Sequence, residues 1–541
     1  MSDGRSPIPT PVNEPIFPYE PGSPERESLH ARVREMEQET VEAPLFIDGQ
    51  EMAGEDTFVQ RSPHKHSLEL ARVQATGPSQ VQKAVDATQK VAREWAETPF
   101  EERAAIFLKA ADLIAGPYRD TLNAATILGQ SKSVYQAEID AACELIDFLR
   151  FNVHYGERIL EEQPFSPDGM WNRMDYRPLE GFVLAITPFN FTAIAGNLPT
   201  APAIMGNVVV WKPSEKQALA AHYTMEVFRK AGLPDGVINL VHGDGALTAE
   251  VCTAQETFAG LHFTGSSTVL QSLFQKTAQN LGNYRTFPRI VGESGGKDFL
   301  IAHPTAEVEP MATAVTRGAF EYQGQKCSAL SRAYIPRSLW PELKDRVVAQ
   351  VEQLTMGDVG DLSTFMGAVI DEGAFKKHRD AIAQGKADGM EVLAGGGTDD
   401  SEGWFVEPTI LVTDDPRHDL MERELFGPVL TVYVYDDDKW DETLELVDTT
   451  SPYGLTGAVW ARDRNVIAQA EATLRNAAGN FYINDKPTGS VVGQQPFGGA
   501  RLSGTNDKAG SLLNLVRWIS PRSIKETFVP PLDWQYPHMG E

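Results

Sequence analysis

Short apolar runs alternate with helical segments between residues 182 and 291, and no other feature of the sequence constrains the fold as strongly. The runs lie at residues 182–186, 208–211, 237–241, 261–263 and 290–291. A strand that is apolar on both faces needs cover on both faces, which βαβ units provide by placing helices on each side of a parallel sheet. The pattern therefore predicts an α/β fold whose ligands bind at the carboxyl ends of the strands.

A second α/β region follows Gly292. Its helical patterns cover residues 305–322, 338–354 and 440–447, and its strand patterns cover 409–412, 429–434, 456–460 and 479–483. Before the first region, residues 45–51 are typical of a strand, a tight turn and a second strand, and helical patterns cover 101–127 and 133–151. These patterns predict two α/β domains.

Three further segments lie outside these domains. Prolines interrupt residues 164–178, where large apolar and polar residues alternate between 170 and 176, and this predicts a protruding hairpin or flap. The tail carries an apolar stretch at 512–519. Because both segments present apolar residues at an edge of the fold, we expect a homodimer or a higher homo-oligomer. Residues 1–44 are rich in Pro and Glu, which predicts an extended arm with a short helix near 27–40, or a loosely ordered leader.

Charge and composition exclude several classes of partner. The formal net charge is −27, from 48 basic and 75 acidic side chains, so nucleic acid and anionic membranes would be repelled. Three cysteines without a CxxC pair, eleven scattered histidines and no HExxH motif give no expectation of a metal site. No apolar run approaches the roughly 18 residues of a membrane helix. The N-terminus resembles neither a secretion signal nor a transit peptide, so we expect a cytoplasmic protein.

Cys327 is the strongest candidate for a reactive group, because it lies between Lys326 and Ser328 in a polar segment that begins at Gly324. A thiol reacts as its thiolate, and a neighbouring cation lowers its pKa from the ordinary value of roughly 8.5. We therefore expect Lys326 to activate Cys327. The alternative is a buried structural cysteine.

Two polar residues follow predicted strands and could act with this thiol. Asn190 follows the strand at 182–186 and could donate N–H groups to an oxyanion, or cap a helix instead. Glu293 follows the strand at 290–291 and precedes two glycines, so it could be a general base or belong to a plain turn.

Two other strand ends suit a nucleotide, although GxGxxG and GxxxxGK[ST] motifs are both missing. Lys212 and Glu215 follow residues 208–210 and could bind a ribose, or form a solvated turn. Gly265 and Ser266 open a predicted helix and could offer backbone N–H groups to a pyrophosphate, or simply cap that helix.

Six motifs in this order resemble the aldehyde dehydrogenase superfamily, over about residues 45–528. They are PFNF (188–191), WKPSE (211–215), FTGS (263–266), ESGGK (293–297), GQKCS (324–328) and ELFGP (424–428). Ser294 replaces the family's usual Leu, and Lys326 before the cysteine is a second departure. Residues 136–142, 325–328 and 488–501 resemble one branch of the superfamily, the L-glutamate γ-semialdehyde dehydrogenases of proline catabolism.

The resemblance implies an NAD-dependent oxidation of L-glutamate γ-semialdehyde to L-glutamate. Cys327 would form a thiohemiacetal and then a thioester, Asn190 and the Cys327 backbone N–H would hold the oxyanion, and Glu293 would activate water. Alternatives within the family are a dehydrogenase of another semialdehyde, such as succinate semialdehyde, and a CoA-acylating enzyme. Alternatives outside it are a cofactor-independent cysteine hydrolase or transacylase, and a non-catalytic protein on this scaffold.

The resemblance also implies the residues that contact NAD and the substrate. The NAD contacts would be Thr187, Pro188, Phe189, Lys212, Ser214, Glu215, Gly265, Ser266, Glu424 and Phe426. The substrate contacts would be Glu144, Lys326, Ser328, Gly489, Ser490 and Phe497. Ser328 and the backbone of Gly489 and Ser490 would bind the α-carboxylate. An acidic Glu215 beside the ribose favours NAD over NADP.

Glu144 is expected to pair with Lys326, or to make only a local contact on its helix. The pairing would neutralise much of the Lys326 charge, which makes Lys326 a structural strut more than an activator of the thiol. The implied fold has a Rossmann-like NAD-binding domain (45–163 and 179–292) and an α/β catalytic domain (293–505). A small β oligomerisation flap and tail (164–178 and 506–541) and the arm (1–44) complete it.

Overall fold

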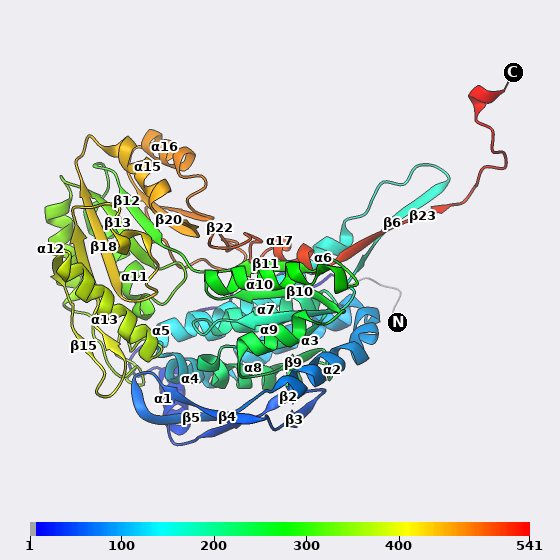
Figure 1. The fold of residues 1–541 in the computed structure, drawn as a ribbon, viewed down its shortest axis with the longest axis horizontal. Coiled ribbons are helices and arrows are strands. Elements are labelled where there is room, and N and C mark those ends of the chain that lie inside the picture. Colours follow the sequence, from blue (N-terminus) through cyan, green and yellow to red (C-terminus); the bar gives the residue numbers. More distant parts are fainter. Residues whose placement is uncertain (1–6, 541) are drawn as a thin grey trace.

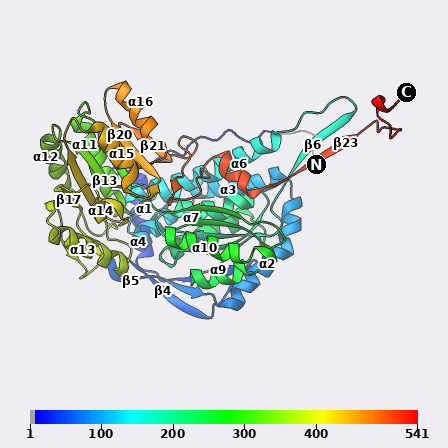
Figure 2. The same ribbon diagram turned by 45° about the horizontal axis from the view of Figure 1, so that its top comes forward.

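Two seven-stranded sheets, each mostly parallel, form the framework of the computed structural model, which describes residues 7–540 (Figure 1). The two sheets lie in separate lobes, and the predicted α/β class is confirmed. A long two-stranded ribbon projects from the first lobe in both views (Figures 1 and 2).

The first sheet contains every strand predicted from the apolar runs. Its order is β11 (Arg289–Glu293), β10 (Phe258–Thr264), β7 (Phe182–Thr187), β8 (Val208–Pro213), β9 (Ile238–Leu240), β2 (Leu45–Ile47) and β3 (Gln50–Met52). The first five strands are parallel, and every residue of β8 and β10 is buried, so the sheet is covered on both faces. The register pairs Ile186 with Lys212 and Thr264 with Glu293, so the loops that follow these strands leave the sheet at one edge.

Helices connect and cover these strands. They are α2 (Pro78–Glu97), α3 (Phe100–Ala115), α4 (Arg119–Gln130), α7 (Thr192–Ile204), α8 (Ala218–Ala231), α9 (Gly245–Thr253) and α10 (Ser267–Gln279). The helix predicted at 101–127 is two helices, because Pro117 lacks the N–H group that a continuous helix needs. The helix predicted at 133–151 is also divided, into α5 (Val134–Ala137), a π-helix η1 (Glu138–Glu144) and α6 (Leu145–Glu161).

The second sheet has the order β14 (Glu391–Ala394), β17 (Thr409–Thr413), β18 (Val429–Tyr435), β13 (Leu330–Pro336), β12 (Asp298–Ala302), β20 (Thr456–Trp460) and β21 (Asn480–Ile483). Only β14 is antiparallel. Its helices are α11 (Val308–Phe320), α12 (Trp340–Val351), α13 (Glu372–Ala387), α15 (Trp440–Thr450) and α16 (Arg464–Thr473). The sequence patterns missed β12, β13, β14, α13 and α16.

The flap predicted at 164–178 does not fold back on itself as a hairpin. Its strand β6 (Met170–Arg177) pairs along its whole length with β23 (Ser520–Thr527), from the other end of the chain. Trp171, Phe528 and Trp534 are exposed on this ribbon and on the tail that follows it.

The N-terminal segment is ordered against the first lobe over the residues that the structure describes. Residues 7–23 are extended apart from a turn, and α1 (Pro24–Met36) follows, three residues earlier than the predicted helix. Tyr19, Leu29 and Met36 are fully buried. This favours the predicted arm over a loosely ordered leader, while residues 1–6 lie outside the described part. None of the helices within residues 7–540 is long and apolar enough to cross a membrane.

Candidate active site

The loop that carries Cys327 joins α11 to β13 through an unusual backbone turn. Tyr322, Gln323 and Gly324 have consecutive positive φ values of 52°, 53° and 64°. The Gln323 side chain holds this turn, because its Nε2 donates to Ser131 O at 2.9 Å and to Ala368 O at 2.8 Å. A Cβ on Gly324 would lie 2.4 Å from Gly427 O, so no larger residue fits there. The strained turn is thus fixed from several sides, as in many functional loops.

Cys327 and Glu293 face each other across the junction of the two sheets. The thiol donates to Glu293 Oε1 at a distance of 3.8 Å. Burial raises the pKa of Glu293 to about 8, although the thiol hydrogen bond and the Lys508 cation lower it. Burial raises the pKa of Cys327 well above its ordinary value, and the charge of Glu293 adds to this shift. At neutral pH both groups therefore rest in their protonated forms.

Lys326 has a different role from the one predicted. Its Nζ pairs with Glu321 Oε2 at 2.9 Å, and both side chains are buried. Although burial opposes it, the cations of Lys326, Lys486 and Arg317 lower the pKa of Glu321 to about 2. The predicted pairing of Lys326 with Glu144 is wrong, and so is the predicted lowering of the Cys327 pKa by Lys326. Glu321 is better placed because it lies in the same short turn as Lys326.

Glu144 lies at the end of the π-helix η1 and lines a cavity rather than making a surface contact on its helix. Burial, together with the nearby carboxylate of Asp140, raises its pKa well above the ordinary value. Burial therefore favours the neutral form of the Glu144 carboxyl group.

Asn190 reaches the cysteine loop from the end of β7. Its Nδ2 donates to Gln325 O at 3.0 Å, and the side chain is buried. It does not cap α7, because that place is taken by Asp140, whose carboxylate accepts from Thr192 N at 3.0 Å and from Ala193 N at 2.8 Å. Asp140 in turn pairs with the buried Lys132. The helix start after Asn190 is thus fixed from η1.

A cavity of 330 Å³, here called the smaller cavity, opens beside Cys327. All six predicted substrate contacts line it: Glu144, Lys326, Ser328, Gly489, Ser490 and Phe497. Ser328 Oγ lies 2.7 Å from Thr488 Oγ1, which joins the cysteine loop to residues 488–494. The wall of the smaller cavity also contains Glu14 and Asp147, and there Arg317, Lys326 and Lys486 place three cations around the single carboxylate of Glu321. Such a cavity suits an anionic group.

A second cavity of 860 Å³, here called the larger cavity, lies on the other side of the cysteine loop. Gln325 lines it, together with five predicted NAD contacts: Phe189, Lys212, Ser214, Glu215 and Phe426. The Phe189 and Phe426 rings meet edge to face at 5.8 Å. The Lys212 ammonium is buried, makes no hydrogen bond or ion pair within residues 7–540, and has its pKa lowered by burial. A buried cation without a partner at the rim of a large cavity fits a polar ligand such as a dinucleotide.

The other predicted NAD contacts do not line the larger cavity. Thr187 Oγ1 accepts from Trp211 Nε1, and Pro188 is half-buried in the turn that leads to Phe189. Gly265 N donates to Glu293 O at 3.1 Å, so this N–H is not free for a pyrophosphate.

Ser266 and Glu424 also have protein partners. Ser266 Oγ caps α10 by accepting from Val269 N at 3.3 Å. Glu424 Oε1 accepts from Gly296 N at 2.9 Å. Their contacts with a cofactor stay predictions.

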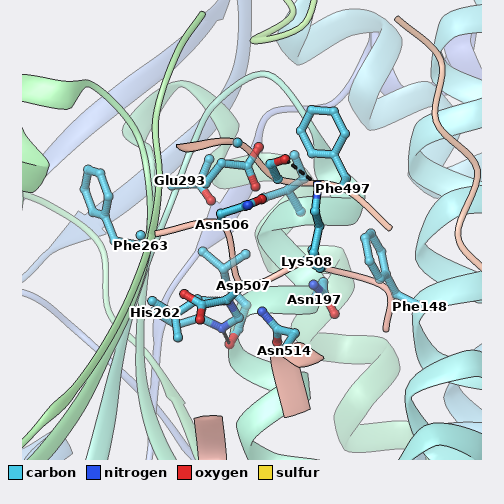
Figure 3. A pocket seen from close by; sticks show the side chains of 18 of the residues that line it. Phe148, Asn197, His262, Phe263, Glu293, Phe497, Asn506, Asp507, Lys508 and Asn514 are labelled. Atoms are coloured by element: carbon cyan, nitrogen blue, oxygen red, sulfur yellow. Dashed lines mark hydrogen bonds between the residues drawn. The ribbon is translucent and has the colours of Figure 1, made fainter. Parts of the chain in front are cut away.

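Glu293 also borders a small cavity of about 40 Å³, shown in Figure 3. Lys508 and Asn506 lie on the same wall, and the Lys508 ammonium donates to Gly479 O and Gly498 O at 2.8 Å each. Lys508, Thr488 and Glu321 were all missed by the sequence reasoning. Lys508 lies in the predicted tail (506–541), to which the sequence analysis gave no catalytic role. The nearest motif in that analysis covers residues 488–501, just before it.

Three comparisons agree with this geometry. The sequence pattern of the aldehyde dehydrogenase family matches residues 50–520. The mitochondrial delta-1-pyrroline-5-carboxylate dehydrogenase of Dictyostelium discoideum is 51% identical over 539 residues, covering 99% of this chain and 97% of that protein. The human enzyme of the same name is 48% identical over 530 residues, covering 98% of this chain and 94% of the human protein. The crystal structure of the Mycobacterium tuberculosis Delta-pyrroline-5-carboxylate dehydrogenase bound with NAD superposes with a TM-score of 0.97, at 53% identity and full coverage of both chains.

Proposed function

The chain belongs to the aldehyde dehydrogenase family and oxidises L-glutamate γ-semialdehyde to L-glutamate with NAD, and we propose that Cys327, Glu293 and Asn190 carry out this reaction. The semialdehyde is in equilibrium with 1-pyrroline-5-carboxylate, and its oxidation is the second step of proline catabolism. The observation that carries the assignment of residues is the position of Cys327 in the wall of the smaller cavity, two residues after Gln325 in the wall of the larger one, with its thiol hydrogen-bonded to Glu293.

Cys327 attacks the aldehyde carbon in the first half of the reaction. In molecules in which Glu293 is ionised, the thiol proton passes to Glu293 Oε1, to which the thiol already donates, and the new C–S bond leaves negative charge on the aldehyde oxygen. One N–H of the Asn190 amide is used by Gln325 O, and the second donates to this oxyanion together with the Cys327 backbone N–H. Losing one such donor costs about 100- to 1,000-fold in rate.

The larger cavity would hold NAD, with Lys212 and Glu215 toward the adenosine ribose and Phe189 and Phe426 at the end nearest the cysteine loop. Bound there, NAD supplies an acceptor for the hydride that leaves the thiohemiacetal. We assign this cofactor site to the first α/β unit, and the exposed carboxylate of Glu215 favours NAD over a cofactor with a 2′-phosphate.

Glu293 completes the reaction as the general base. Once it has released the thiol proton, its carboxylate takes a proton from water, which attacks the Cys327 thioester. Cysteine suits this step because a thiolate is a good leaving group. The Lys508 cation helps to keep the Glu293 carboxylate ionised.

The smaller cavity accounts for the choice of substrate. Ser328 and the backbone N–H groups of Gly489 and Ser490 bind the α-carboxylate, while Phe497 packs on the methylene groups. The excess of cations at this end stabilises the carboxylate further. A dehydrogenase of succinate semialdehyde would not need a site for an α-amino acid, and a cofactor-independent hydrolase would have no use for the larger cavity.

We place the enzyme in the cytoplasm, because Cys143, Cys252 and Cys327 are all free thiols, as is common in a reducing compartment. Two of the relatives described above are named as mitochondrial. Fractionation of cells that express the tagged full chain separates the two locations.

The enzyme should be a homodimer or a larger homo-oligomer. The ribbon of β6 and β23 carries Trp171 and Phe528 into solvent, away from either lobe, and a second copy would cover them (Figure 1). Light scattering of the purified protein should give at least twice the chain mass of 59.4 kDa, and Trp171→Asp should shift the protein toward monomer. A monomeric wild-type protein contradicts this proposal.

With NAD and 1-pyrroline-5-carboxylate, we expect NADH formation, followed by absorbance. Cys327→Ala should reduce turnover by more than about 1,000-fold, because the nucleophile is removed, while NAD still binds in calorimetry. Cys143→Ala is the matched control, since Cys143 lines the same cavity without facing the reacting carbon. Turnover of succinate semialdehyde without turnover of 1-pyrroline-5-carboxylate would contradict the substrate assignment.

The rate of thioester hydrolysis should rise with pH, reach half its maximum near pH 8 and level off above it. Glu293 acts as a base only when ionised, and its pKa is raised to about 8, so the base is lost as the pH falls below that value. Release of acetate from acetylated Cys327, formed with p-nitrophenyl acetate, measures this step without NAD. Lys508→Met should move the profile to higher pH, because the cation lowers the Glu293 pKa. A profile that is flat between pH 6 and 9 would remove Glu293 from this role.

Ser328→Ala should raise KM for the semialdehyde about tenfold, because the α-carboxylate loses one hydroxyl donor. It should change KM for propanal, which has no carboxylate, by less than about twofold. Initial rates measured with both aldehydes give the change in KM for each substrate. Equal effects on the two substrates would mean that Ser328 does not bind the carboxylate.

A further inference from the structure

The N-terminal arm (residues 7–20) forms part of the wall of the smaller cavity. Asn13, Glu14 and Ile16 line it, beside the residues that bind the substrate carboxylate. The arm belongs to neither α/β unit, and none of its residues takes part in the reaction described above. Its contacts nevertheless place it within reach of the carboxylate-binding loop (residues 488–494).

The arm is held rigidly on the helices of the first lobe. Glu14 accepts from both Arg119 and Arg150 at 2.7 Å. Glu138 accepts from Phe17 N at 2.9 Å and from Tyr19 Oη at 2.8 Å. Most of these groups are buried, so the hydrogen bonds face little competition from water. The arm therefore provides a fixed edge for the cavity.

Asn13 connects this fixed edge to the carboxylate-binding loop. Its Nδ2 donates to Asp147 Oδ2 on α6 and to Val492 O in the loop, each at 2.8 Å. Its Oδ1 accepts from Gln494 Nε2 at 2.9 Å. Both N–H bonds and the carbonyl oxygen of the amide are thus engaged, and two of the three bonds go to the loop.

The loop has few other attachments. Thr488 at its start bonds to Ser328 and to Lys486. The remaining hydrogen bonds of residues 489–494 in the described chain stay within 489–495, so both bonds that tie these residues to a distant segment are made with Asn13. Gly489 and Gly493 have φ values of +100° and +82°, which gives the loop backbone additional freedom. Without Asn13, residues 489–494 would lose both hydrogen bonds to a distant segment and would keep only the packing of the buried Val492 and the anchor at Thr488.

We propose that Asn13 is a positioning residue that fixes the carboxylate-binding loop and thereby selects aldehydes that carry an α-carboxylate. The inference rests on the proposed role of Gly489 and Ser490. An ordered loop binds the carboxylate without a further loss of conformational entropy, whereas a loosened loop must be immobilised on binding. Asn13 has no contact with Cys327 or Glu293, so the chemical step on a small aldehyde should not depend on it.

Asn13→Ala in the full chain tests the proposal. We expect KM for L-glutamate γ-semialdehyde to rise about tenfold, as the loop loses two hydrogen bonds, with kcat changed by less than about twofold. The kcat/KM for propanal and the KM for NAD should stay within about twofold of wild type. Asn13→Asp, which keeps the size but loses the donor to Val492 O, should be at least as harmful.

Gln494→Ala breaks the same link from the other side and affects an exposed residue, so it remains informative if Asn13→Ala fails to fold. It should raise the same KM, and the double variant should be no worse than the more severe single variant. Tyr19→Phe is the control: it removes the two hydrogen bonds of the Tyr19 hydroxyl, with Glu138 and Asn123, neither of which reaches the loop, so it should lower the melting temperature without changing the ratio of the two KM values.

The outcomes separate this inference from the proposed function. If Ser328→Ala changes the ratio between the semialdehyde and propanal while Asn13→Ala and Gln494→Ala affect both aldehydes equally, the arm does not select the substrate and the inference is wrong. If Ser328→Ala also affects both aldehydes equally, the carboxylate site itself is wrong. If KM rises for the semialdehyde but not for propanal in all three variants, the result supports both the carboxylate site and the role of Asn13.

Discussion

The hydrogen bond from the Asn190 amide to the Gln325 carbonyl joins the two sheets at the point where the chemistry occurs. One partner follows a strand of the first sheet, and the other precedes the nucleophile at the edge of the second. The distance between donor and thiol therefore depends on how the two lobes pack. Asp140 fixes the start of α7 from the π-helix η1 within the first lobe, so the backbone next to Asn190 is held in place on that side. Small shifts between the lobes would misplace both groups.

Burial governs the acid–base properties of the site more than any single ion pair does. It raises the pKa values of both Cys327 and Glu293, so the resting enzyme keeps a neutral thiol beside a neutral carboxyl group. Such a pair is protected from adventitious oxidation and alkylation, which require a thiolate. Lys326 does not disturb this state, because Glu321 neutralises its charge. The thiol proton of Cys327 must therefore be transferred when the substrate binds.

The architecture and the three central groups could be predicted because strand ends of parallel sheets converge, so Asn190, Glu293 and the cofactor loops had to share one edge. Pairing choices could not be predicted in the same way. The sequence suggested Glu144 as the partner of Lys326, whereas the turn at 321–324 brings Glu321 to it. The pairing of β6 with β23 and the seating of Asn13 against Val492 join segments hundreds of residues apart, and sequence periodicity carries no information about such contacts.

The pairing of β6 with β23 also sets an order for synthesis. Arg177 and its partner Ser520 are 343 residues apart, so a ribosome working at roughly 5–20 residues per second needs about 20–70 s between them. During that interval β6 is an unpaired edge strand in the nascent chain. Arg173, Asp175 and Arg177 alternate with its apolar residues, and charges at such positions discourage pairing with other chains. The ribbon is therefore the last element of the fold to close.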